Sequence, residues 1–178
     1  MGITLYTGGC RSGKSGLAVA LAKEISENVC FIATCVPEDD EMRLRVKRHQ
    51  EERPASWQLI EEPVGLARAI SKVDADAYPV ILVDCLTLWV CNLMCQEKNP
   101  LATEQEMEAQ AQKLIDAANQ HSSEVIFVSN EVGMGIMPAN AMSRNYADQA
   151  GRCNQVIARE ADKVIFVSCG IGITLKQE

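Results

Sequence analysis

The fold is decided by one short stretch, Gly8-Gly9-Cys10-Arg11-Ser12-Gly13-Lys14-Ser15. It joins an apolar run at Ile3–Thr7, which predicts a strand, to a helical pattern from Lys14 to Ser26. Glycines let the backbone curl so that several N–H groups point inward, and the N-terminus of the following helix adds positive potential. This arrangement predicts a phosphate-binding loop. The alternative is an ordinary glycine-rich turn between a strand and a helix. In that case the presence of Lys14, Ser15 and both flanking elements would be a coincidence.

Strands and helices alternate on either side of this loop. Val80–Val83 is a continuous apolar run, which is typical of a strand buried on both faces of a parallel sheet. Further strands are expected at Val29–Ala33, Trp57–Ile60, Val125–Ser129 and Val164–Ser168, and helices from the acidic cluster at 38–41 to Arg53, at Val64–Val73, Leu86–Gln96, Glu104–Gln120 and Ser143–Ala161. The pattern predicts an α/β fold, a three-layer domain with a mostly parallel sheet. We expect one domain over residues 1–178. Its last part, Cys169–Leu175, contains two glycines.

Composition excludes several classes of protein. A formal net charge of −7 argues against a general nucleic-acid binder, which needs positive charge to displace counterions. No apolar stretch is long enough for a membrane span, so we expect a cytoplasmic location. The eight cysteines form no C-x-x-C pair, and there are only two histidines, so reduced structural thiols are expected rather than disulfides or zinc ligands.

Two single residues carry chemistry beside the loop. Asp84 follows the buried strand, where a carboxylate holds magnesium in phosphate-loop enzymes, although an aspartate here is also a common helix cap. His49 has Arg45 and Arg53 four positions away on either side, on one helix face. Guanidinium groups bind phosphate, and a neutral imidazole can attack an α-phosphorus. A solvated charged helix with an incidental histidine remains the alternative from spacing alone.

A second glycine-rich loop, Asn130–Pro138, also follows a predicted strand. Open α/β sheets bind ligands at such positions, and its glycines permit close backbone approach. A plain structural turn is the alternative. On the next helix, Arg144 and Asp148 are spaced for an i,i+4 ion pair, which we expect to be structural.

Several motifs together are similar to those of one enzyme family. They are Thr7–Ser15, Ala33-Thr34-Cys35, Asp39-Asp40-Glu41-Met42 with Arg45, His49, Arg53 and Pro54, the Asn130–Pro138 loop, and Gly170-Ile171-Gly172 near the end of the chain. The chain resembles, over nearly its entire length, the bifunctional adenosylcobinamide kinase/adenosylcobinamide-phosphate guanylyltransferase family of cobalamin synthesis. The resemblance implies phosphorylation of the aminopropanol hydroxyl of adenosylcobinamide, then transfer of GMP from GTP to that phosphate.

The resemblance also implies roles for individual residues. His49 matches the histidine that carries GMP. The phosphates of GTP would lie against Gly8, Gly9, Cys10, Arg11, Ser12, Gly13, Lys14 and Ser15, and the rest of the nucleotide site would be lined by Ala33, Thr34, Cys35, Gln50, Glu51, Glu52, Arg53, Glu61 and Asp84. Ser15 and Asp84 would hold Mg²⁺. The implied fold is a P-loop sheet that is RecA-like, and the implied assembly is a homotrimer whose substrate is a corrinoid.

The chain departs from the family pattern at two positions, where Cys10 replaces an expected alanine and Cys35 an expected serine. A histidine pair is sometimes seen in this helix, but here Arg48 precedes His49, which leaves one candidate nucleophile. The two cysteines bear on nucleotide preference and affinity and not on the reaction class. Relatives can retain only one activity, so a guanylyltransferase with weak or absent kinase activity is one alternative. A P-loop regulatory NTPase is another, although the chain has little room for a partner-binding region. The phosphate loop does not distinguish ATP from GTP as the kinase donor, because it contacts phosphates and not the base.

Overall fold

One sheet organises the molecule. The structure is a computed structural model that describes residues 2–37, 39–40, 42–44, 46, 53–98 and 100–177. The strands are β1 (Ile3–Gly8), β2 (Val29–Ala33), β3 (Gln58–Glu61), β4 (Val80–Asp84), β5 (Glu124–Val128), β6 (Lys163–Ser168) and β7 (Ile171–Gln177). Their order in the sheet is β3-β2-β4-β5-β1-β6-β7. All neighbouring strands are parallel except β6 and β7, which pair antiparallel at one edge.

Both faces of the central strands are buried, which explains their continuous apolar sequences. Successive side chains of a strand point to opposite faces. Leu5 and Phe127 accordingly belong to the core on one face, whereas Tyr6 and Leu82 belong to the core on the other. Val80–Val83 is completely excluded from solvent, as the sequence predicted.

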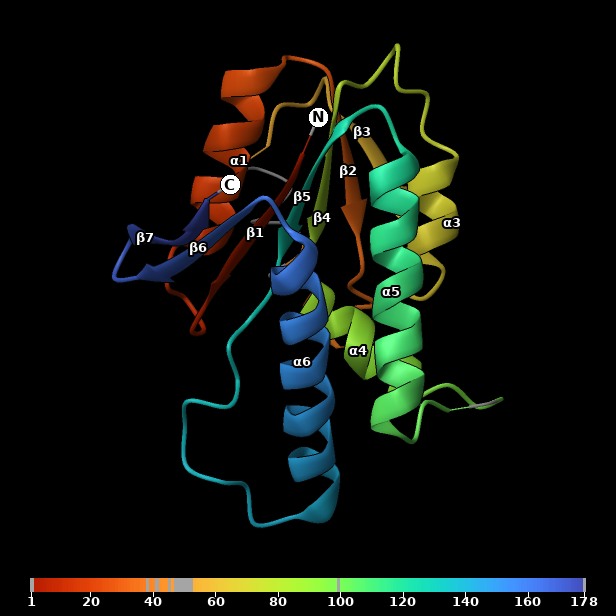
Figure 1. Ribbon diagram of the computed structural model, residues 1–178, viewed down its shortest axis with the longest axis vertical. Helices are drawn as coiled ribbons and strands as arrows, with labels where there is room; N and C mark the ends of the chain where they lie inside the picture. The colour runs from red at the N-terminus through yellow and green to blue at the C-terminus, as the bar shows by residue number, and fades with distance from the viewer. Residues whose placement is uncertain are drawn as a thin grey trace.

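Helices cover the two faces unequally, giving three layers (Figure 1). One face is covered by α1 (Lys14–Ile25), whose Ala18 and Ala22 are fully buried. The other face is covered by α3 (Leu66–Ser71), α4 (Leu86–Met94), α5 (Glu104–Gln120) and α6 (Ala141–Glu160). A capping box between Thr103 and Glu106 begins α5, because each residue binds an otherwise unpaired backbone N–H of the first turn. The predicted three-layer α/β architecture is confirmed.

Some expected boundaries were wrong. The helix expected at Val64–Val73 is only α3, because the Glu62 carboxylate accepts the N–H groups of Val64 and Gly65 and holds them in a turn. Similarly, α4 ends at Met94 and not at Gln96. The last glycine-containing segment forms the antiparallel strand β7.

The helix expected to carry His49 falls mostly outside the described residues. Within it, residues 42–44 are helical, and Asp39 begins this turn by accepting the N–H of Met42 at 2.7 Å. His49 and Arg45 lie outside the described residues, as do Gln50, Glu51 and Glu52. Among the described helices, none has the length and apolar character needed to cross a bilayer.

The parallel pairing brings the ends of five strands to one edge of the sheet. Ala33 at the end of β2 pairs with Glu61 of β3 on one side and with Asp84 of β4 on the other. Asp84 in turn pairs with Val128 of β5, and β5 lies beside β1, which ends at Gly8. Residues far apart in the sequence therefore meet at the carboxyl edge, where open α/β sheets bind ligands.

Candidate functional site

The phosphate loop owes its shape to two glycines. Gly13 has φ 96°, and a Cβ there would lie 3.0 Å from the Cα of Gly170. Gly8 has φ 153°, and a Cβ there would lie 2.3 Å from the carbonyl oxygen of Val167. Since β6 and its following turn approach the loop this closely, any side chain at either position would push them apart.

A turn whose contact with the loop was not predicted braces the loop from outside. Gly170, between β6 and β7, donates its N–H to the carbonyl oxygen of Ser12 at 2.8 Å. It needs a left-handed conformation, with φ 79°, to do so. The only signal in the sequence was the pair of glycines near the end of the chain.

Lys14 and Ser15 open α1 directly beneath the loop. Lys14 is buried, and its Nζ donates to the carbonyl oxygen of Gly9 at 3.1 Å, so the ammonium group lies within the loop. Ser15 is half-buried on the first turn of α1. Ser12 is also buried, and no described group hydrogen-bonds to its Oγ. The N-terminus of α1, one ammonium group and a buried hydroxyl therefore converge where phosphate oxygens would bind.

Asp84 is half-buried at the end of β4, and the chain around it is fixed by Thr34. The Thr34 hydroxyl donates to the carbonyl oxygen of Cys85 at 2.7 Å and accepts the Cys85 N–H at 2.9 Å. Asn92 of α4 donates its Nδ2 to the carbonyl oxygen of Thr34 at 2.8 Å and to that of Pro63 at 3.0 Å. Thr34 is fully buried, and its hydroxyl is hydrogen-bonded within the protein, so it positions the Cys85 backbone. Its expected contact with the nucleotide stays a prediction.

A second clamp holds Asn130, at the end of β5. Its N–H donates to the Thr87 Oγ1 at 2.7 Å, and its carbonyl oxygen accepts from the Nδ2 of Asn154 at 3.1 Å. Asn154 in turn accepts from the Ser129 hydroxyl at 2.6 Å. The Asn130 Oδ1 is buried, and no described group hydrogen-bonds to it. Asn130 lies two residues beyond β5, and β5 lies between β4, which ends at Asp84, and β1, which leads into the phosphate loop.

The clamp residues Thr87 and Asn154 were not anticipated. Thr87 lies in the first turn of α4, and Asn154 lies in the middle of α6. Neither residue belongs to a recognisable motif, and only the packing of both helices on the sheet brings them to Asn130. The Asn130–Pro138 loop was predicted as either a ligand loop or a plain turn, and its root is now joined to the phosphate loop, since Glu131 donates its N–H to the Gly8 carbonyl oxygen at 2.9 Å.

The other expected nucleotide residues occupy different environments. Ala33 and Cys35 are half-buried around the end of β2, and Glu61 is exposed at the end of β3. Arg53 is half-buried, and its guanidinium carbon lies 3.7 Å from the ring centroid of Phe31, a cation–π contact. The ion pair expected between Arg144 and Asp148, which both lie in the described part of the chain, is not formed. The Arg144 guanidinium donates instead to the carbonyl oxygens of Pro138 and Ala139.

All eight cysteines are free thiols, as expected. Burial raises the pKa of Cys30 to about 11 and that of Cys153 to about 12. Burial, together with the nearby charge of Asp84, raises the pKa of Cys85 to about 11. The thiol next to the site is therefore protonated at neutral pH. Among the described residues, no group of three or more His, Cys, Asp or Glu side chains could hold a metal ion.

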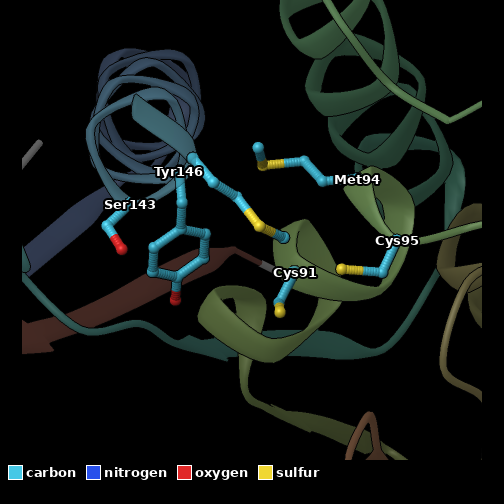
Figure 2. Close-up of a pocket in the computed structure, with 6 residues that line it drawn as sticks. Cys91, Met94, Cys95, Ser143 and Tyr146 are labelled. Carbon is cyan, nitrogen blue, oxygen red and sulfur yellow. The ribbon is translucent and has the colours of Figure 1, made fainter. Parts of the chain in front are cut away.

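A cavity of about 200 Å³ lies between α4 and α6 (Figure 2). It is lined by Cys91, Met94, Cys95, Met142, Ser143 and Tyr146. Figure 2 shows the Tyr146 ring and the Met94 side chain projecting from the two helices into the space between them. The Tyr146 ring is held in place at this cavity because its hydroxyl donates to the Thr87 carbonyl oxygen at 3.2 Å. Burial raises the pKa of the Tyr146 hydroxyl. Sequence analysis did not predict this cavity.

Comparison with known proteins adds to this geometry. Residues 4–175 match the family model described as cobinamide kinase / cobinamide phosphate guanyltransferase. The chain is 39% identical over 175 residues to the bifunctional adenosylcobalamin biosynthesis protein CobP of Pseudomonas aeruginosa, covering 98% of this chain and 97% of that protein. It is 40% identical over 180 residues to the bifunctional adenosylcobalamin biosynthesis protein CobU of Escherichia coli, covering 97% and 98%.

One solved structure is similar to this chain in fold. The crystal structure of the RadB recombinase matches with a TM-score of 0.50 and 18% sequence identity, covering 93% of this chain and 73% of that one. At this identity the match concerns the fold alone. The expectation of a RecA-like, mostly parallel sheet is confirmed.

Proposed function

The chain belongs to the cobinamide kinase / cobinamide phosphate guanyltransferase family, and on that premise we propose that it catalyses both reactions in adenosylcobalamin synthesis. It phosphorylates adenosylcobinamide and then transfers GMP from GTP to adenosylcobinamide phosphate, releasing pyrophosphate. One observation carries the proposal: a phosphate loop at the carboxyl edge of a RecA-like sheet, in a chain that matches the family over residues 4–175. We propose that a single domain, residues 1–178, carries both activities.

In the kinase step, the acceptor hydroxyl oxygen attacks the γ-phosphorus of the nucleotide. The bond from that phosphorus to the bridging oxygen breaks, the nucleoside diphosphate leaves, and the hydroxyl proton is lost to solvent or to the phosphate. Charge accumulates on the phosphate oxygens during this transfer. The loop N–H groups and the Lys14 ammonium are positioned to stabilise it. Since these groups contact phosphate and not the base, we propose that ATP and GTP both serve as donor.

The residues present also fit a magnesium ion. Mg²⁺ binds through one or two protein oxygens together with substrate phosphates and water. The half-buried Ser15 hydroxyl and Asp84 carboxylate are two such oxygens, one on the first turn of α1 and one at the end of β4. When bound, the ion would neutralise charge on the phosphates. Thr34 holds the Asp84 segment in place through the Cys85 backbone, and Asn92 in turn holds the Thr34 carbonyl oxygen.

For the guanylyl step we propose His49 as the carrier of GMP. An imidazole nitrogen attacks the α-phosphorus of GTP, the bond to the β-phosphate oxygen breaks, and pyrophosphate leaves. An oxygen of adenosylcobinamide phosphate then attacks the same phosphorus, the P–N bond breaks, and adenosylcobinamide-GDP forms. The support is the spacing of Arg45, His49 and Arg53 and the family resemblance of that segment. The same resemblance supports nucleotide contacts from Gln50, Glu51, Glu52 and Glu61.

The first experiment is incubation of the protein with magnesium and GTP labelled on the α-phosphate, followed by denaturation. We expect label that is acid-labile and alkali-stable on the wild type and none on His49→Ala. The His49→Ala variant must still bind GTP, which controls for folding. An unlabelled wild type that binds GTP would overturn the covalent-histidine mechanism. It would leave the kinase reaction in place.

A second experiment separates the two activities. Adenosylcobinamide and adenosylcobinamide phosphate are supplied in separate assays, and product is measured from each. Product from both acceptors is expected. Product from the phosphate alone would identify a guanylyltransferase that lacks the kinase step. NTP turnover that responds to a protein partner and ignores corrinoid would instead identify a regulatory NTPase.

Location and assembly follow from the same proposal. ATP and GTP are cytoplasmic metabolites, and we propose that the enzyme acts there. We also propose a homotrimer, as the family resemblance implies. Sedimentation equilibrium should give three times the chain mass of 19.5 kDa, and a monomer mass would contradict this part of the proposal.

A further inference from the structure

The loop between β5 and α6 exposes a group of apolar side chains. Met134 is 73% exposed, Ile136 98% and Met137 66%, and Met142 on the first turn of α6 is 65% exposed. Figure 1 shows this loop standing away from the sheet beside the N-terminal end of α6. Soluble proteins seldom expose apolar side chains in a group unless the group binds something. We name these four residues the methionine surface.

The methionine surface is held at both ends. At its start, Glu131 and Asn130 donate their N–H groups to the Gly8 carbonyl oxygen and to Thr87. At its end, the Arg144 guanidinium donates to the carbonyl oxygens of Pro138 and Ala139, at 3.1 and 2.6 Å. Asn140 then caps α6 by accepting the Ser143 N–H at 2.7 Å. The loop is therefore anchored between the phosphate loop and α6.

The position of the surface relates it to the reacting phosphate. Met134 to Met137 lie four to seven residues beyond Asn130. An extended chain covers at most about 3.5 Å per residue, so these side chains lie within roughly 25 Å of the phosphate loop. A ligand that contacts both places must be large and must carry its reacting group on an arm.

The charges around the surface restrict its ligand further. Between Glu131 and Arg144 the chain has no Asp, Glu, Lys or Arg. An anionic membrane would require flanking basic residues, which this segment lacks. Methionine side chains are flexible and polarizable, so they adapt to large ligands of irregular shape. The surface thus suits a large ring system fringed with methyl groups better than a polyanionic nucleotide or a lipid headgroup.

We propose that Met134, Ile136, Met137 and Met142 bind the corrin ring of the acceptor while its aminopropanol arm reaches the phosphate loop. This inference rests on the proposed function, which supplies an acceptor with a methyl-rich ring and a reactive arm. Met142 also lines the cavity between α4 and α6, which continues the apolar surface beyond the loop. That cavity, at about 200 Å³, has room for a substituent of the ring and not for the ring itself.

The test compares two acceptors and two variants. The loop variant combines Met134→Ser, Ile136→Ser and Met137→Ser. The matched control combines Ile173→Ser and Leu175→Ser on β7, whose side chains are 53% and 64% exposed. The acceptors are adenosylcobinamide and free 1-amino-2-propanol, which has the reacting hydroxyl without the ring. Phosphorylation is measured for every combination, with GTP affinity as a check of folding.

We expect the loop variant to raise the KM for adenosylcobinamide at least tenfold while its kcat stays near that of the wild type. The control should match the wild type, and free 1-amino-2-propanol should react equally slowly with all three proteins. An unchanged KM in the loop variant would overturn the proposal. A loop variant that sediments at a lower mass than the wild type would overturn it too, because the surface would then be a contact between copies of the chain.

Failure of the proposed function has a different signature. In that case the wild type itself would phosphorylate neither acceptor. Binding of adenosylcobinamide is then measured directly by ultrafiltration, using the visible absorbance of the corrin. Wild-type binding that the loop variant loses would still support the methionine surface as a corrin site, and no binding by the wild type would overturn it.

Discussion

The hydroxyl of Thr34 and the backbone of Cys85 exchange two hydrogen bonds, of 2.7 and 2.9 Å, across 51 residues of sequence. One hydroxyl thereby satisfies both the N–H and the carbonyl group of the residue that follows Asp84. Neither β2 nor β4 could supply these bonds from its own ladder, because both strands end there. Thr34 therefore fixes the direction in which the chain leaves the sheet beside the proposed magnesium ligand.

Substitution of Thr34 by valine tests this clamp. Valine has nearly the same shape but leaves the Cys85 N–H unpaired, whereas the Cys85 carbonyl oxygen still accepts the Trp89 N–H at 3.2 Å. A buried unpaired N–H costs about 1–3 kcal/mol, so we expect a loss of stability of this size in urea denaturation. Thr174→Val on the exposed strand β7 is the matched control and should change stability little. Equal stabilities of the two variants would show that the clamp contributes nothing.

Two glycines of the nucleotide loop region should respond oppositely to alanine. Gly13→Ala places a Cβ 3.0 Å from the Gly170 Cα at φ 96°, so we expect nucleotide affinity to fall at least tenfold. Gly16, inside α1, has no atom within 4 Å of the position of a Cβ. Gly16→Ala should raise stability by roughly 0.5–1 kcal/mol, because glycine is a poor helix former.

Isothermal titration with a non-hydrolysable nucleotide and thermal denaturation measure the two effects. Tight nucleotide binding by Gly13→Ala would mean that the loop does not need its left-handed residue.

Asn130 should position a reacting group. Its backbone N–H and carbonyl oxygen are both hydrogen-bonded, to Thr87 and Asn154. No described group hydrogen-bonds to its buried Oδ1. We expect Asn130→Ala to lower the kcat of the kinase step about 10- to 100-fold with little change in nucleotide affinity. Asn28→Ala, at an exposed turn, is the control.

Asn130→Asp separates positioning from structure, since it keeps the size of the side chain. If both variants lose stability and nucleotide affinity together, with kcat unchanged in the folded fraction, the role of Asn130 is structural only.

Alkaline pH should destabilise the fold through its buried thiols. Burial raises the pKa of Cys153 to about 12, above the ordinary thiol value of 9.0. Below pH 9 the thiol is protonated in both states and there is no penalty. Between pH 9 and about 12 the unfolded chain loses this proton first, so the free energy of unfolding falls by up to about 1.4 kcal/mol per pH unit.

The measurement is urea denaturation from pH 7 to pH 10.5. Cys153→Ala will be less stable at pH 7 because it leaves a small cavity, but its stability should decline less steeply above pH 9 than that of the wild type. Identical slopes in the two proteins would contradict the prediction.

Much of the fold could be predicted because its signals are local. Glu104–Gln120 was predicted with the observed bounds from the polar pattern of consecutive residues, and the capping box that the structure shows at its start is also formed by neighbouring residues. Val29–Ala33 was likewise predicted with the observed bounds. The shortening of α3 was missed because it depends on a side-chain contact, from Glu62 to Gly65, that competes with the helical pattern.

The sequence by itself determined the phosphate loop, the alternation of strands and helices, and hence the fold class and the family. These follow from glycine spacing, hydrophobic periodicity and residue order, which are all properties of neighbouring residues. Only the tertiary structure decided that Thr34 holds Cys85, that Thr87 and Asn154 hold Asn130, and that Gly170 braces Ser12. Those contacts join residues that are 24 positions apart, as for Asn130 and Asn154, up to 158 positions apart, as for Ser12 and Gly170. Hydrogen bonds of this kind form only after the buried strands have set the order of the sheet, so no local pattern in the chain announces them.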